Sequence, residues 1–269
     1  MADSPARSPR NARAAPAGAP RGRSLFFLYA LSILLGLLAW QWIAQHYSGF
    51  VLAGPPAVLA RLADMTASGE LPRAFAGAAR HMMLGFAISI AVAIPLGLAM
   101  GRLKVLHDML DPVVNLVYAV PAVAWAPLIM IWFGLFFEAR VALVVLMCTI
   151  DMLIVVSEGS RSIDRRLLAV GRSFGAGPWR NARLVLLPAS VPFLFAALRI
   201  GAVRAVNAMI TAELFLAAVN LGAIMKQASV RFDSAAVLGV LFLLSLFGLL
   251  LQEMLLLAEK RICRWMQRV

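Results

Sequence analysis

Charged residues are scarce in this chain of 269 residues. Only 14% of them are Asp, Glu, Lys or Arg, against about a quarter in ordinary soluble domains. In contrast, 62% are hydrophobic, and the mean hydropathy is +0.86. A water-soluble globule of this size could not hide so much apolar surface, and a disordered chain would carry far more polar residues. The composition therefore predicts an integral membrane protein.

Cysteine and histidine are also scarce, at two and three residues. Cys148 lies in an apolar run and Cys263 in a basic C-terminal segment, so neither a disulfide nor a thiolate metal site is indicated. His46, His81 and His107 lack the spacing of metal ligands. The sequence contains no G-x-x-x-x-G-K-[ST] motif, so it cannot hydrolyse ATP through a P-loop. No catalytic, metal or cofactor site is predicted.

Acidic residues are outnumbered by basic ones, 13 to 25, and the net charge is +12. Such an excess could attract nucleic acid or anionic lipid, or it could set membrane orientation. The arginines are dispersed over four polar segments and form no compact patch, which argues against nucleic acid. Orientation is the explanation that the dispersed pattern favours.

Six segments are apolar and long enough to cross about 30 Å of hydrocarbon. Pro121 and Pro127 interrupt the third segment, so we expect it to be kinked or tilted. Between the first two segments, a surface helix and a loop are expected over residues 45–76, and residues 214–234 are expected to form a loop. The sequence thus predicts an all-α fold with spans at residues 25–44, 82–100, 112–137, 141–157, 189–212 and 235–252.

The distribution of basic residues predicts the topology of these spans. Seventeen of the 25 fall on one side, in the N-terminal tail, the segments after the second and fourth spans, and the C-terminal tail. By the positive-inside rule, both termini are cytoplasmic. We expect residues 1–24 to be a disordered basic tail, residues 25–260 the membrane domain, and residues 261–269 a second basic tail.

The longest polar segment, residues 158–188, carries six arginines. Ser162 or Asp164 can cap a helix start, after which apolar residues recur at helical spacing. The run Gly175-Ala176-Gly177 ends that helix, and Pro178 suits the first turn of another. Such a cytoplasmic helix pair could lie on anionic lipid, or it could dock into a groove on a cytoplasmic partner.

This segment resembles the coupling loop of ABC-importer permeases. Gly175 matches the glycine of the family signature, and residues 186–188 (Leu-Leu-Pro) match its end. The Glu-Ala-Ala positions fall on residues 169–171, which are Ala, Val and Gly, so the glutamate is missing. Loop residues that the resemblance assigns to contact with an ATPase are Asp164, Leu167, Leu168, Ala169, Gly171, Phe174, Gly175, Ala176, Leu187 and Pro188.

From about residue 55 to residue 260, the chain resembles importer permeases of the nitrate, sulfonate, taurine and bicarbonate type. The order and spacing of the matching fragments carry this resemblance. They are Pro56 with Val58-Leu59, residues 97–101 (Gly-Leu-Ala-Met-Gly), Asp111-Pro112, Pro127-Leu128, residues 132–134 (Trp-Phe-Gly), Asp164, Arg199 and Ala212-Glu213.

This resemblance implies a non-enzymatic permease subunit in a bacterial inner membrane. It further implies a permease dimer, with a homodimer favoured, two cytoplasmic ABC ATPases and an extracytoplasmic solute-binding protein. The implied cargo is a small anionic solute such as a sulfonate, taurine or nitrate. A secondary transporter would need intramembrane ion sites and internal repeats, and a membrane enzyme would need clustered His or carboxylates; the sequence shows neither.

Ionisable residues within spans are costly and therefore candidate functional residues. At 1.5 Å per residue, Asp151 lies roughly 9 Å deep, Arg199 roughly 15 Å and Arg204 roughly 22 Å. Depth thus favours an Asp151–Arg199 pair. For Arg204, two alternatives remain open: with Asn207 it faces the translocation path and favours an anionic or polar solute, or it makes a structural contact, with Glu213 or with another subunit.

Overall fold

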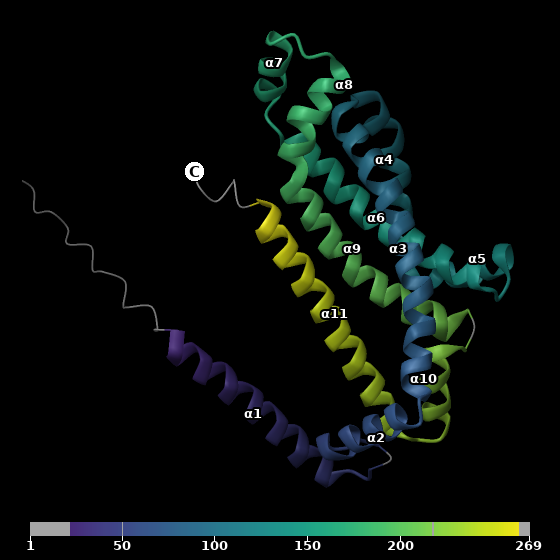
Figure 1. The fold of residues 1–269 in the computed structure, drawn as a ribbon. Helices are drawn as coiled ribbons and strands as arrows, with labels where there is room; N and C mark the ends of the chain where they lie inside the picture. Colours follow the sequence, from purple (N-terminus) through teal and green to yellow (C-terminus); the bar gives the residue numbers. More distant parts are fainter. Residues whose placement is uncertain (1–21, 50, 217, 264–269) are drawn as a thin grey trace, which may run out of the picture.

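The computed structural model describes residues 22–49, 51–216 and 218–263, and all regular secondary structure among them is helical (Figure 1). The tail expected to be disordered, residues 1–24, lies outside the described residues except for residues 22–24, which belong to α1. The elements are α1 (Gly22–His46), α2 (Pro55–Ala67), α3 (Glu70–Arg102), α4 (Lys104–Ala119), η1 (Ala122–Trp125), α5 (Ala126–Phe133), α6 (Phe137–Ser162), α7 (Arg165–Ser173), α8 (Pro178–Asn181), η2 (Ala182–Leu186), α9 (Leu187–Phe215), α10 (Asn220–Val230) and α11 (Ser234–Ile262).

Five helical stretches among the described residues are long and apolar enough to span a membrane. They correspond to predicted spans one, two, four, five and six, and each extends beyond the predicted bounds at one end or both. The third predicted span is instead a broken pair, in which α4 and the segment Val123–Phe133 meet at 94°. Counting that pair as one span gives the six that the sequence predicts.

The break in the third span lies at Pro121. α4 begins at Lys104, directly after α3, and continues through Pro112 to Ala119. Pro121 then precedes the short 3₁₀ helix η1, and α5 begins again with Pro127 in its first turn, where the missing N–H costs nothing. The expected kink is therefore a sharp turn, and α5 projects away from the other long helices in Figure 1.

The centre of the bundle is formed by α3, α6 and α9. Small residues recur every fourth position along one face of α3, which brings its backbone close to α6. A Cβ on Gly97 would lie 2.8 Å from the Cβ of Val156, and one on Gly85 would lie 2.6 Å from the Cβ of Val144. The residues in this small-residue stripe are Gly85, Ser89, Ala93, Gly97 and Gly101.

Two elements differ from what the sequence predicts. α3 begins at Glu70, directly after Gly69 in a left-handed conformation (φ 73°), because Pro72 fits the first helical turn and does not break the helix. The expected loop at 214–234 contains α10, whose polar N-terminal Asn220 and internal glycine gave no apolar periodicity. An ion pair of 2.9 Å between Arg61 and Asp233 joins α2 to the start of α11.

The polar connections lie at two ends of the bundle (Figure 1). α7 and α8 lie at the end where α3 and α6 terminate, while α2 and α10 lie at the other end. Helix α1 packs mainly through its C-terminal part, where Trp40 Nε1 donates a hydrogen bond of 3.1 Å to the carbonyl of Ala53. The rest of α1 is separate from the bundle.

Candidate functional site

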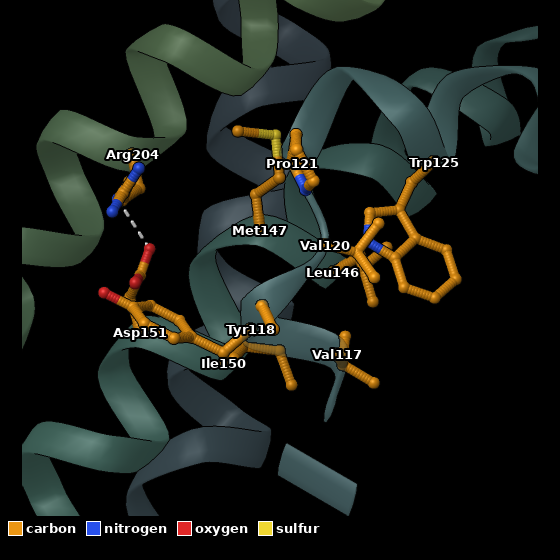
Figure 2. Close-up of a pocket in the computed structure, with 11 residues that line it drawn as sticks. Val117, Tyr118, Val120, Pro121, Trp125, Leu146, Met147, Ile150, Asp151 and Arg204 are labelled. Carbon is orange, nitrogen blue, oxygen red and sulfur yellow. Dashed lines mark ion pairs between the residues drawn. The ribbon is translucent and has the colours of Figure 1, made fainter. Parts of the chain in front are cut away.

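A cavity of about 410 Å³ lies where the broken third span passes α6 and α9 (Figure 2). One wall is the C-terminal end of α4 with the turn at Pro121, and the opposite wall comes from α6. Most of the lining is aliphatic or aromatic, and the charged groups in it are one acid and one base. The lining residues are Val117, Tyr118, Ala119, Val120, Pro121, Trp125, Leu146, Met147, Ile150, Asp151 and Arg204.

The charged groups of the cavity form an ion pair between α6 and α9. Arg204 Nε lies 2.6 Å from Asp151 Oδ2, with the Asp151 side chain 11% exposed and the Arg204 side chain 42% exposed (Figure 2). The guanidinium can thus reach the cavity while it neutralises the carboxylate. Cavity and pair together present a positive and a negative group beside an apolar wall.

The predicted Asp151–Arg199 pair is wrong. Arg199 instead pairs with Glu259 of α11, at 3.5 Å between Nη1 and Oε2. Depth was the basis of the prediction, but five residues rotate a side chain by about 140° around a helix of 3.6 residues per turn. Arg199 therefore faces α11 when Arg204 faces α6, and the long arginine side chain spans the remaining difference in depth.

The alternative Arg204–Glu213 contact is also wrong. Glu213 is fully buried, and its carboxylate accepts hydrogen bonds from Asn220 Nδ2 at 2.7 Å and from the backbone N–H of Gly222 at 3.1 Å. The Nδ1 atom of His81 lies 3.9 Å from the same carboxylate. Glu213 therefore fastens the end of α9 to the start of α10.

Asn207 lies on α9 three residues after Arg204, so the two share one helical face. It is exposed, whereas its neighbours Val206 and Ala208 are buried. The cavity lining does not include it. Asn207 therefore extends the polar strip of α9 beyond the cavity, toward a surface that this single chain leaves open.

The loop between α6 and α9 has the predicted helix–glycine–helix form. Asp164 caps α7 by accepting a hydrogen bond of 2.8 Å from the Arg166 N–H, as predicted for one of two candidate caps. Gly175 has a φ of 76°, a left-handed conformation in which glycine is favoured. α8 then begins at Pro178, and the chain continues from there without interruption into α9.

The predicted apolar stripe of α7 is divided between two directions. Leu168 and Gly171 face α8, where Asn181 Nδ2 donates a hydrogen bond of 2.8 Å to the Leu168 carbonyl and the Asn181 side chain fills the space above Gly171. Leu167 and Phe174 are exposed, and the Phe174 side chain is 86% exposed. Ala169 and Ala176 flank this outward-facing pair.

The predicted loop ends at Pro188 and the predicted span begins at residue 189, but Pro188 lies inside the continuous helical stretch Pro178–Phe215. A proline ring would clash with the carbonyl four residues earlier in an ordinary α-helix. The preceding turn, Ala182–Leu186, is a π-helix, in which the wider turn relieves this clash. Leu187 and Pro188 therefore belong to an uninterrupted helical connection between the loop and the membrane span.

Sequence reasoning missed several residues of these two sites. Asn181 holds α7 against α8, but a single asparagine among arginines carries no sequence signal. Tyr118 and Trp125 were not among the predicted site residues, because only the sharp turn at Pro121 brings them to the same cavity. Among the described residues, no group of three or more His, Cys, Asp or Glu side chains could hold a metal ion.

Comparison with known proteins places this geometry in a family. A family model described as the inner membrane component of binding-protein-dependent transport systems matches residues 89–263. The riboflavin transport system permease RibX of Chloroflexus aurantiacus is 31% identical over 237 residues, which cover 87% of this chain and 88% of RibX. The taurine transport system permease TauC of Escherichia coli is 27% identical over 85% of this chain and 86% of its own length.

Solved structures agree on the fold. A chain of the MetNI methionine ABC transporter, in inward-facing conformations, superimposes with a TM-score of 0.60 and 21% identity. The match covers 73% of this chain and 98% of that chain. Helical spans, the turn-linked loop and the family match agree: the chain belongs to the binding-protein-dependent transport system inner membrane components, the permease subunits of ABC importers.

Proposed function

We propose that the α7–α8 loop is the contact surface for a cytoplasmic ABC ATPase. The observation that carries this proposal is the outward-facing apolar group on an otherwise arginine-rich segment, in which Leu167, Val170 and Phe174 are all more than half exposed. Such a group fits a protein groove, as apolar faces of amphipathic helices do. The missing family glutamate removes one polar contact and leaves this apolar contact in place.

The loop and the cavity are connected by one helical rod. From Pro178 to Phe215, α8, η2 and α9 form a continuous stretch of 38 residues. Arg204 lies on this rod about 39 Å from Pro178, at 1.5 Å per residue. An ATPase that moves the loop would therefore tilt the helix that carries the positive charge of the cavity, which is the coupling that alternating access requires.

The charge distribution supports a cytoplasmic position for the loop. The ends of α3 and α6, the first residue of α4, the segment from α7 to η2 and the last turn of α11 carry 10 basic residues within the described chain, against six at the α2 and α10 end. Positively charged connections are retained in the cytoplasm. We accordingly propose that both termini lie on the cytoplasmic side of a bacterial inner membrane.

The cavity is proposed as a part of the translocation path. Because Asp151 already balances Arg204, the site favours a solute that offers both an anionic group to the guanidinium and a donor to the carboxylate. A zwitterionic amino sulfonate or amino acid has this chemistry, as taurine does, the solute in the name of TauC. RibX is named for riboflavin, whose ring suits an apolar wall such as that of Tyr118 and Trp125. The solutes in the two names thus match the charged pair and the aromatic wall of the cavity, respectively.

A second copy of this chain is proposed to complete the path. The helix α5 and the turn after it expose large apolar side chains away from the bundle, among them Ile131, Trp132 and Phe136. In a homodimer that covers this surface, the face of α9 that carries Arg204 and Asn207 would also lie toward the second copy. An extracytoplasmic binding protein would then deliver the solute at the α2 and α10 end.

The ATPase contact can be tested by purification from native membranes. Tagged permease should retain a protein with a G-x-x-x-x-G-K-[ST] motif at about one copy per permease, and the complex should hydrolyse ATP. Phe174→Asp should abolish that retention. Val230→Asp introduces the same charge at a similarly exposed apolar residue at the opposite end of the bundle and should leave the retention intact. Loss of the ATPase in both variants, or in neither, contradicts the contact.

The path role of Arg204 needs a variant that keeps the fold. Arg204→Met with Asp151→Asn removes both charges together and leaves no buried charge unpaired. The solute is identified on the binding protein that co-purifies with the permease, and it is then labelled. This solute should no longer enter proteoliposomes that carry the double variant, while ATPase retention persists. Normal uptake with the double variant would refute the path role and leave the ATPase proposal untouched.

A further inference from the structure

A groove of about 950 Å³ lies beside the loop, outside the cavity described above. It runs between the C-terminal end of α3 and the segment formed by α8, η2 and the start of α9. Pro95, Leu98 and Ala99 form one wall, and Leu186 and Leu187 form the other. This part of the groove is therefore apolar.

The polar end of the groove is basic. Arg102, Arg172 and Arg183 line it, and no acidic residue is found among the described residues of the lining. Arg102 donates one weak hydrogen bond from Nη1 to the Ile163 carbonyl at 3.5 Å. Its Nε and Nη2 atoms are buried and have no partner within the described chain, so a turn of the side chain toward the groove would give these two donors an acceptor.

The apolar wall and the cations follow one another along the helix axis, as the acyl chain and the headgroup of a lipid do. Pro95 and Arg102 are seven residues apart on α3, which places the guanidinium about 10 Å along the helix from the deepest wall residue. Arg102 is the last residue of its membrane-spanning helix, at the depth of lipid headgroups. Trp179, which is 81% exposed, lines the groove at the same level, where interfacial aromatic residues are favoured.

We propose that this groove binds an anionic phospholipid, with its phosphate on Arg102 and Arg183 and an acyl chain along Pro95, Leu98 and Leu187. Basic pockets between helices on the cytoplasmic side of a membrane bind such headgroups. A free phosphate would satisfy the arginines but leave the apolar walls exposed, and a protein partner would have to bring acidic and apolar groups into the membrane interface. The lipid supplies both at once.

The lipid would also connect the loop to the bundle. Arg183 belongs to the π-helical turn, and Arg172 belongs to α7, whereas Arg102 belongs to α3. One phosphate that accepts hydrogen bonds from these arginines would hold the α7–α8 loop against α3. ATP hydrolysis by the importer would consequently depend on the anionic lipid content of the membrane.

The binding site can be tested by native mass spectrometry of the intact transporter complex. Delipidated complex is titrated with phosphatidylglycerol, with phosphatidylcholine, and with sn-glycerol 1-phosphate as the isolated headgroup. Wild type should retain phosphatidylglycerol in preference to phosphatidylcholine. Arg102→Gln with Arg183→Gln should weaken this binding about 30-fold, the change expected for two arginines at an anionic lipid.

The matched control is Arg73→Gln with Arg231→Gln, two exposed arginines at the other end of the bundle, which should bind as wild type does. Quenching of Trp179 fluorescence by brominated phosphatidylglycerol, measured as the difference from Trp179→Phe, should report the acyl chain in the groove. Equal binding of phosphatidylcholine, displacement by the free headgroup at the same concentration as by lipid, or retention of lipid by the ATPase-free permease but not by the intact complex would each overturn the proposal. The last outcome would identify the groove as a protein interface.

Discussion

Asp151 of α6 and Arg204 of α9 meet at 2.6 Å on the wall of the cavity, and their side chains are unequally exposed. The carboxylate is nearly buried, whereas the guanidinium is 42% exposed. The carboxylate therefore needs the ion pair more than the guanidinium does. An unpaired buried charge is strongly unfavourable, but a partly exposed arginine can turn toward water.

This asymmetry predicts different costs for the two single substitutions. Arg204→Met leaves the Asp151 carboxylate buried without a partner and should destabilise the chain by about 3–5 kcal/mol. Asp151→Asn leaves the exposed guanidinium hydrated and should cost clearly less. Thermal unfolding of the detergent-solubilised complex measures both. The double variant should recover most of the loss, and a double variant less stable than Arg204→Met would contradict the pairing.

Gly222 is predicted to tolerate no side chain. A Cβ there would lie 2.6 Å from the backbone carbon and the Cβ of Glu213, and neither atom is the end of a flexible chain. Gly222→Ala should therefore displace α10, weaken the two hydrogen bonds to Glu213, and cost about 1–3 kcal/mol. Gly248→Ala is the control, since a Cβ there meets nothing within 4 Å; equal unfolding temperatures of the two variants would contradict this contact.

The close approach of α3 and α6 gives a similar prediction. Gly97→Ala would place a methyl group 2.8 Å from the Val156 Cβ and 3.2 Å from the Leu153 carbonyl. The two helices must then separate, at a cost of about 1–3 kcal/mol. Gly36→Ala on the separate helix α1, where nothing lies within 4 Å, should leave the unfolding temperature within error of wild type. An unchanged unfolding temperature for Gly97→Ala would mean that the helices pack less closely.

The sequence predicted the spans well because membrane insertion depends on hydrophobic length, which is a local property. Helix–glycine–helix geometry in the loop was also predictable, since Asp164, Gly175 and Pro178 act on their own backbone. The ion pairs were not, because the rotation of α9 relative to α6 and α11 is set by packing. Depth along a helix could not decide between Arg199 and Arg204 as the partner of Asp151.

The sharp turn in the third span was underestimated for a related reason. Three prolines lie in or near it, at positions 112, 121 and 127, and local rules treat each as a kink or a helix start. Only Pro121 lies at the break where the two helical parts meet at 94°, and Tyr118 and Trp125 reach the cavity because of it. The small residues of α3 recur at a regular spacing in the sequence, but only the packing shows that α6 is the helix that they contact.

The loop conformation predicts a last pair of variants, both glycine to alanine. Gly175 has a φ of 76° and open space around it, so Gly175→Ala is strained only in its backbone, by about 1–2 kcal/mol. Gly177 has φ −63° and ψ 168°, also in open space, which alanine adopts freely, as expected before a proline. The proposed ATPase contact requires the native angle between α7 and α8, and Gly175→Ala should shift that angle.

Solute uptake per ATP hydrolysed, measured in proteoliposomes, distinguishes these variants. Gly175→Ala should lower this ratio, and Gly177→Ala should match wild type. Gly175→Asn should fall between the two, because asparagine tolerates the left-handed region better than alanine. The order glycine, asparagine, alanine is specific to backbone strain: a role for the loop that depended on side-chain volume would instead rank the larger asparagine as the most harmful.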